Sequence, residues 1–198
     1  MRVPLSCALL IAATRLAHPV LAQQPSEQVT QPPTTPTFLV PAGANTQDTD
    51  MRFLCAVAAA AIGTSPPLVL AVDAKAPWRP ELLDFLRRAE PAQLLQLGEL
   101  PAPPAPWNGK LSTSVANDST GIACELAARF FPTAKSAVLC TFAERGAALS
   151  AAVLAARLHV PLLPCTHDGL DERVRARLAS SGIAQVFPVG RDAPTKLD

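Results

Sequence analysis

Cys165, His167 and Asp168 lie within four residues of one another, directly after an apolar segment of the chain. Thiolate, imidazole and carboxylate groups are ligands of zinc and other transition metals. A closed structural site needs four such ligands, and this one short cluster does not supply them. We therefore expect no metal here, and we treat His167 and Asp168 as candidate binding residues.

The motifs of nucleotide binding and nucleophilic catalysis are absent from the sequence. Neither G-x-G-x-x-G nor G-x-x-x-x-G-K-[ST] occurs, and the nearest segment, Pro41 to Asn45, has one glycine and is typical of a plain turn. Ser150 lies within a helical Leu-Ser-Ala segment instead of a G-x-S-x-G elbow. Beyond residue 22, His159 and His167 are the only histidines that could act as a base. We expect a non-catalytic protein without a cofactor.

Basic side chains concentrate toward the C-terminus, where contacts to an anionic polymer would use them. Acidic residues are interleaved with these arginines, so an ordinary solvated helix face is the alternative. With Asp73 from the first half of the chain and the His167–Asp168 pair, the candidate binding residues include four arginines: Arg145, Arg173, Arg177 and Arg191.

Charge and composition argue against a general nucleic-acid binder. The 198 residues carry 17 basic and 16 acidic side chains, and they include no tyrosine. Removal of the first 22 residues would take away Arg2 and Arg15 and change the formal net charge from +1 to −1. A balanced chain with few aromatic residues lacks both the electrostatic footprint and the stacking groups of nucleic-acid recognition.

The N-terminus predicts export. Arg2, an apolar run from Leu5 to Ala13 and the small-residue site Val20-Leu21-Ala22 are typical of a secretory signal over residues 1–22. Residues 23–36 are polar and proline-rich, which predicts a disordered tether. No apolar run is long enough to span a membrane. We expect a secreted, periplasmic or cell-surface protein.

Two stretches, about residues 50–98 and 144–190, repeat the same order of helix, strand, helix and strand. In each, an alanine-rich helix leads through a proline, Pro67 or Pro161, into an apolar strand. An amphipathic helix follows, with Leu82 and Leu86 on one face in the first copy and Val174 and Leu178 in the second. The second strand of each copy stops at a glycine. Such repetition predicts two units of one design, 37–98 and 119–198, joined by a proline-rich linker over 99–118.

The pattern predicts an α/β fold: Rossmann-like parallel sheets with helices on both faces, built from two related βαβαβ units. Apolar strands separated by long helices require a parallel sheet that is covered on both faces. We expect strands at 37–40, 67–72, 93–97, 136–141 and 185–189, and helices at 50–62, 79–89, 119–131 and 147–158. Ligands of such sheets bind beyond the carboxyl ends of the strands. That edge would carry Asn45, Asp73, Lys75, Gly98, Glu144, Arg145, His167, Asp168, Gly190 and Arg191.

Four cysteines follow the predicted signal: Cys55, Cys124, Cys140 and Cys165. Four thiols allow three pairings, and the sequence does not choose among them. Cys140 and Cys165 would lie on adjacent strands, which makes them the best candidates for a bridge. Each cysteine nevertheless lies in an apolar helix or strand, where buried free thiols are common, and we favour free thiols.

The second unit contains a series of small and apolar segments: Ala148–Ala152, Leu154–Ala156, Val160–Leu163 and Ile183–Val186 with the end at Gly190. Through these segments it resembles the type-2 cell-wall-binding repeats of bacterial surface proteins, and Asp118–Ala127 is similar to the preceding helix of that family. The resemblance covers most of 117–191 and, more loosely, 52–98. The family usually has an aspartate where this chain has Ala147, an Asp-Arg pair where it has Asp118-Ser119, and a Gly-Gly ending where it has Gly190-Arg191. It also tends to use three repeats, and two are visible here.

The resemblance implies a Rossmann-like module that holds a protein non-covalently to an anionic wall polymer. We therefore predict a non-catalytic module that binds an anionic cell-envelope polymer or a surface partner. The first alternative is a periplasmic small-molecule-binding or enzymatic domain with a ligand at the strand ends. The second is a structural unit that self-associates through its alanine-rich helices, 50–62 and 147–158.

Overall fold

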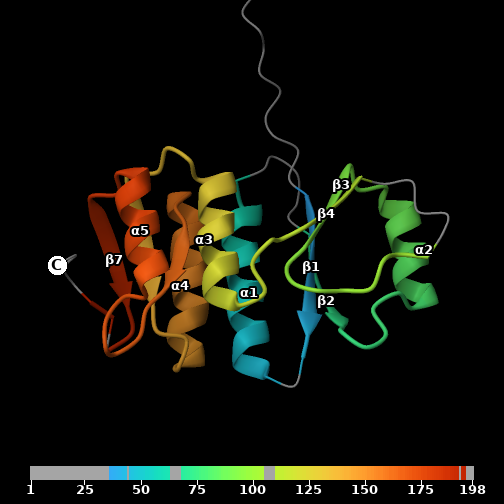
Figure 1. Ribbon diagram of the computed structural model, residues 1–198, viewed down its shortest axis with the longest axis horizontal. Helices are drawn as coiled ribbons and strands as arrows, with labels where there is room; N and C mark the ends of the chain where they lie inside the picture. The colour runs from blue at the N-terminus through green and yellow to red at the C-terminus, as the bar shows by residue number, and fades with distance from the viewer. Residues whose placement is uncertain (1–35, 44, 63–67, 105–109, 192, 195–198) are drawn as a thin grey trace, which may run out of the picture. The chain divides into compact units, whose positions relative to one another are not determined.

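The computed structural model describes residues 36–43, 45–62, 68–104, 110–191 and 193–194 (Figure 1). The predicted signal and nearly all of the predicted tether lie outside these residues. Residues 32–198 form one compact unit. All paired strands of the two sheets are parallel, which confirms the predicted α/β class and its Rossmann-like character.

The first sheet has four strands in the order β2-β1-β3-β4. These are β1 (Thr37–Ala42), β2 (Val69–Asp73), β3 (Gln93–Gln96) and β4 (Lys110–Thr113). Phe38 of β1 pairs with Val69 on one side and with Leu95 on the other. Because β1 is central and buried, its residues form an apolar run without alternation, as expected of a covered parallel strand.

The second sheet has three strands in the order β6-β5-β7. They are β5 (Ser136–Cys140), β6 (Leu162–Pro164) and β7 (Gln185–Val189). Val138 of the central strand pairs with Leu162 and Phe187, in the way that Phe38 pairs with its two neighbours in the first sheet. The two βαβαβ segments therefore share one strand order, with the first strand in the middle.

Five helices accompany the sheets: α1 (Thr46–Ala60), α2 (Pro80–Ala89), α3 (Ser119–Phe130), α4 (Arg145–Leu158) and α5 (Glu172–Ser181). Helix α2 covers one face of the first sheet, where Leu86 packs with Leu39, Val72 and Leu94. The other face belongs to a larger core shared by α1, α3, α4 and the second sheet. In Figure 1 these three helices lie between β1 and strand β7 of the second sheet, and α2 lies on the opposite side of β1. The predicted inward pairs are confirmed, since Leu86, Val174 and Leu178 are buried and Leu82 packs against the smaller core that contains Leu86.

Helix α1 is the element that joins the two sheets. It contacts β1 and β2 of its own sheet, and it also packs against α3, α4 and the edge strand β6 of the other sheet. Its alanines 56, 58, 59 and 60 are buried almost completely, which lets neighbouring backbones approach closely from several directions. The thiol of Cys55 donates a hydrogen bond to the carbonyl oxygen of Leu162 at 3.6 Å. The open edge of the second sheet is thus covered by a helix from the first half of the chain.

Arg52 fixes α1 to its surroundings by polar contacts. Its guanidinium donates to the carbonyl oxygens of Leu97 at 3.1 Å and Asn117 at 2.7 Å, and it forms an ion pair with Asp48 at 2.7 Å. Gly98 has φ +122°, and a side chain there would collide with the Arg52 guanidinium. The backbone angle therefore favours the glycine that ends the predicted strand, and a side chain there would also have to displace the Arg52 guanidinium.

Two elements differ from the sequence prediction. Strand β4 lies inside the segment 99–118 that the sequence predicts as a linker, so the first sheet has four strands in place of three. Helix α1 begins at Thr46 and not near residue 50, because the Asn45 side chain accepts a hydrogen bond from the Asp48 N–H and caps the helix. The remaining described elements agree with the prediction to within a few residues at each end.

The four described cysteines are free thiols, in accord with the reading favoured from the sequence. The bridge considered between Cys140 and Cys165 is absent. Cys140 pairs in register with Pro164, so Cys165 is one position further along the neighbouring strand. Since successive side chains of an extended strand point to opposite faces, these two thiols are not placed to bond.

Enlarging a buried alanine of α1 tests its role as the joining helix. We expect Ala59→Leu to lower the free energy of unfolding by about 1–3 kcal/mol, because the site is 1% exposed and a larger side chain forces its neighbours apart. Ala176→Leu on the exposed face of α5 is the matched control and should change stability by less than about 0.5 kcal/mol. Urea denaturation measures both, and equal stabilities would contradict the proposed packing.

Candidate functional site

Two adjoining hollows lie where the strands of both sheets end and the helices begin. The first has a volume of about 650 Å³ and the second about 490 Å³. Gln47, Phe142 and Ala143 line both, so they form the divide between the two. These volumes are in the range of small-ligand sites, roughly 300–1,000 Å³. Their position agrees with the rule that ligands of parallel sheets bind at the carboxyl ends of the strands.

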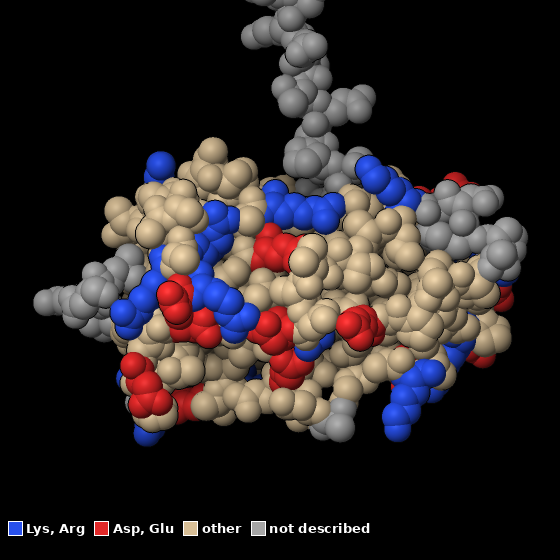
Figure 2. Space-filling view, in the orientation of Figure 1, with Lys and Arg blue, Asp and Glu red and all other residues tan. Residues whose placement is uncertain are grey.

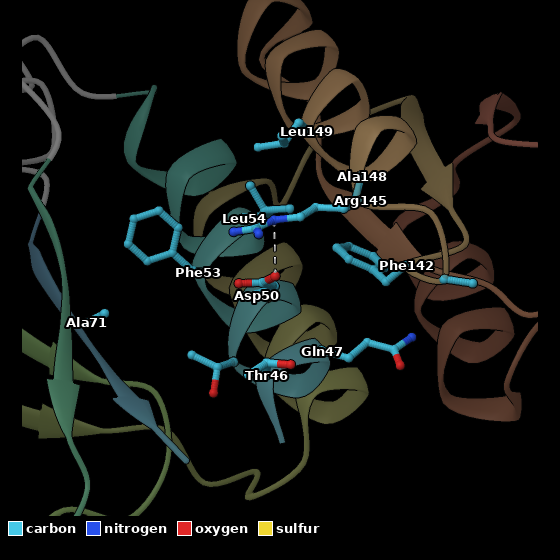
Figure 3. Close-up of a pocket in the computed structure, with 12 residues that line it drawn as sticks. Thr46, Gln47, Asp50, Phe53, Leu54, Ala71, Phe142, Arg145, Ala148 and Leu149 are labelled. Carbon is cyan, nitrogen blue, oxygen red and sulfur yellow. Dashed lines mark ion pairs between the residues drawn. The ribbon is translucent and has the colours of Figure 1, made fainter. Parts of the chain in front are cut away.

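The first hollow is lined by the start of α1, the start of α4 and the edge strand β2 (Figure 3). Apolar side chains form most of its wall: Phe53 and Leu54 from α1, Phe142 after β5, and Leu149 from α4. One ion pair crosses it, between the Arg145 Nε and the Asp50 Oδ2 at 3.5 Å. Both side chains stay largely in contact with solvent, so this pair is weak and open to exchange.

The second hollow is richer in hydroxyl groups. Thr120 at the start of α3, Thr141 after β5 and Thr166 after β6 line it together with Gln47. His167 also lines it, and its Nε2 lies 3.0 Å from the Asp168 Oδ1. Both members of this pair are about three-quarters exposed, so the pair lies at the rim. Such a surface offers hydrogen bonds to a polar ligand.

Cys165 also lines the second hollow, and it is not activated for chemistry. Burial raises the pKa of its thiol to about 12, and burial raises the pKa of the neighbouring Cys140 thiol to about 11. A thiol with a raised pKa is protonated at neutral pH and is a poor nucleophile or metal ligand. Metal binding by the Cys-Thr-His-Asp segment would therefore have to displace the Cys165 proton. Over the residues that the structure describes, no group of three or more histidine, cysteine or acidic side chains is arranged to hold a metal ion.

Arg173, a predicted polymer-binding residue, is committed to a contact within the protein. Its guanidinium lies 2.8 Å from the Asp118 Oδ2 and 3.2 Å from the Asp171 Oδ1. Asp118 caps α3 by accepting from the Gly121 N–H, and Asp171 caps α5 by accepting from the Arg173 N–H. One arginine thus links the N-terminal caps of two helices, which we call the cap clamp. The hydrogen bonds from Arg173 lower the pKa of both carboxyl groups.

The other predicted site residues are spread over the molecule. Asp73 ends β2, where hydrogen bonding by the Lys75 N–H lowers its pKa and Arg79 approaches at 3.3 Å. Arg177 donates to the Ser180 hydroxyl on α5, and Arg191 is exposed just after β7. Of the predicted set, Arg145 lines the first hollow and His167 the second, and Asp168 touches His167 at the rim. Neither hollow is lined by Asp73, Arg173, Arg177 or Arg191.

The charge on the face that Figure 2 shows is mixed in the region of α5. Figure 2 shows acidic side chains interspersed with basic ones over the region of α5. The face that carries Arg173 and Arg177 is therefore closer to an ordinary solvated helix than to a dedicated cationic surface.

Several residues of the hollows were not predicted. Gln47 precedes the helix start that the sequence suggests, at residue 50, so its position on the inner rim depends on the unpredicted cap at Asn45. Phe53 and Phe142 carry no chemical signal in the sequence, and only the packing of α1 beside α4 brings them together.

None of the helices in the described part of the chain is long and apolar enough to cross a membrane.

The fold is shared with solved structures of bacterial cell wall proteins. Cwp6 from Clostridium difficile matches 78% of this chain with a TM-score of 0.63 and 12% identity. Cwp8 from the same organism matches 80% with a TM-score of 0.59 and 16% identity. The chain spans about a quarter of each, 25% and 27% of their lengths. No protein-family model and no curated protein matches the chain. At these identities the likeness shows a cell-wall-protein-like fold.

The cap clamp predicts a loss of stability in acid. Because the folded-state pKa values of Asp118 and Asp171 lie below the ordinary value of about 3.9, their contribution is complete above that pH and is lost as the pH falls through the lowered values. We expect Arg173→Gln to cost about 0.5 kcal/mol at pH 7 and to flatten the decline in stability below about pH 4, since all three side chains are partly exposed.

Urea denaturation between pH 7 and pH 2 measures this effect. Arg175→Gln, an exposed arginine on the same helix, is the control and should keep the pH dependence of the parent. Identical pH profiles for the parent and the Arg173 variant would show that the clamp contributes nothing.

Proposed function

We propose that the chain is a non-catalytic module of the cell envelope that binds an anionic envelope polymer. The fold shared with Cwp6 and Cwp8, two cell wall proteins, is the observation that carries this proposal. The predicted signal over residues 1–22 agrees with it, because an envelope module must be exported. The location follows as cell surface or periplasm.

The binding surface of this proposal is the edge at which the strands end. Arg145 and Arg191 supply positive charge there, and both side chains are exposed. The threonine hydroxyls of the second hollow and His167 add hydrogen-bond donors beside them. Arg177, further along α5, would contact a longer polymer. Arg173 contributes less than the sequence suggests, because its charge is already balanced by Asp118 and Asp171.

Exposed arginine contacts of this kind give modest affinity that weakens as salt screens the charges. A repeating polymer can engage several of them together, which raises the overall affinity. The mixed charge on the face that Figure 2 shows suits a polymer that follows one edge of the molecule.

Co-sedimentation with envelope sacculi of the source organism tests the proposal. We expect the protein to pellet with intact sacculi, to pellet less at high salt, and to stay in solution once the anionic polymers have been extracted. Arg145→Gln and Arg191→Gln should each weaken binding about two- to fivefold, because each removes one exposed ionic contact.

Arg157→Gln is the matched control, since Arg157 is exposed near the opposite end of α4. It should pellet like the parent. Absence of pelleting under every condition would contradict the proposal, and pelleting that survives polymer extraction would point to a surface protein as the partner.

A small-molecule site is the second candidate function, and the two adjoining hollows favour it. Their volumes suit a small ligand, and Phe142 with the surrounding threonines gives the apolar wall and few polar groups typical of such sites. Saturable binding of a soluble envelope fragment that is insensitive to salt would support this function over polymer attachment.

A further inference from the structure

Strands β2 and β6 are matching edge strands of the two sheets, and different elements cover them. Strand β6 is covered by α1 and α3, and its Leu162 carbonyl accepts a hydrogen bond from Cys55. Strand β2 is at the matching edge of the first sheet, and the first hollow opens beside it at Ala71, which is exposed. Within the described residues α1 also contacts β2, but no second helix packs on that strand as closely as α3 packs on β6, so this edge of the first sheet is covered less completely.

The far wall of the first hollow is an apolar ridge on α4. Leu149 is 51% exposed and Val153 is 56% exposed, although both are large apolar residues. They are four residues apart and so lie on one face of the helix. Leu149 lines the hollow, with Phe53 of α1 on its other side (Figure 3). A ridge and a hollow of apolar character thus lie next to each other on one face of the molecule.

This face also carries one basic and one acidic side chain beside the first hollow. Arg145 and Asp50 stand on the two helices that flank the hollow, and they are 80% and 43% exposed. A partner of a single charge would place a like charge against one of them. A second copy related by a two-fold axis would set each Arg145 against the other copy's aspartate, so the face is complementary to itself.

We propose that a second copy of this chain covers the face, as a two-fold symmetric dimer in which the α4 ridge of each copy fills the first hollow of the other. Leu149 and Val153 enter the partner's hollow beside Phe53 and Ala71, and the Arg145–Asp50 pairs exchange between copies at the rim. The dimer gives β2 the kind of additional cover that α3 gives β6. The dimer shares Arg145 with the proposed polymer-binding edge, and its test is therefore made without polymer.

Sedimentation-velocity analysis of the full chain over a range of concentrations tests the dimer. We expect a reversible monomer–dimer equilibrium in the parent. Leu149→Glu should raise the dimer dissociation constant about a hundredfold, because it would bury an unpaired charge at the contact. Leu158→Glu is the control: Leu158 is also exposed on α4 but lies on another side of the helix, and this variant should associate like the parent.

A charge exchange tests the two-fold geometry without touching the apolar ridge. Arg145→Asp alone and Asp50→Arg alone should each weaken self-association, since two copies of one variant oppose like charges. An equimolar mixture of the two variants should associate like the parent, because both contacts then join opposite charges. A parent that stays monomeric at every concentration, or a mixture no better than its components, would overturn the proposal.

Discussion

The structure depends on one helix whose surroundings leave room only for small side chains. Helix α1 belongs to the first sheet by chain order, yet its alanines pack against α3 and α4, and its Cys55 reaches the edge of the second sheet. The distance between the axes of two packed helices, about 8–10 Å, is set by the size of the side chains at their contact. The alanine-rich composition is therefore what allows one helix to serve two sheets and to merge two small cores into a larger one.

This joining helix also sets where chemistry can occur. Because the strands of both sheets are parallel and α1 begins beside α4, the carboxyl ends of the strands and the first turns of these helices meet along one edge. The hollows open at that edge with a mixed lining of aromatic, hydroxyl and charged side chains. Two residues that the sequence suggests as site residues have other roles in the fold. Burial raises the pKa of the Cys165 thiol, and Arg173 forms ion pairs with the capping residues of two helices.

Most of the fold could be predicted because each element carries a local signal. The apolar strands, the alanine-rich helices and the Leu82–Leu86 and Val174–Leu178 pairs depend on spacing within one segment. Strand β4 carries no such signal, since Lys110 to Thr113 is short, follows a proline-rich stretch and gains its identity by pairing with β3. The site was predicted only in part for the same reason: the Asp50–Arg145 and Arg173–Asp118 contacts join helices that are distant in sequence.

An NMR titration of the isotopically labelled protein with the anionic polymer extracted from the source envelope tests the central claim most directly. Polymer attachment along the carboxyl edge predicts shifted amide signals around Gln47, Phe142, Arg145, His167 and Arg191, with smaller shifts at high salt. Signals at the opposite ends of the strands, such as those of Thr37 and Ser136, should stay unchanged. An unperturbed spectrum, or shifts confined to those opposite ends, would contradict the account.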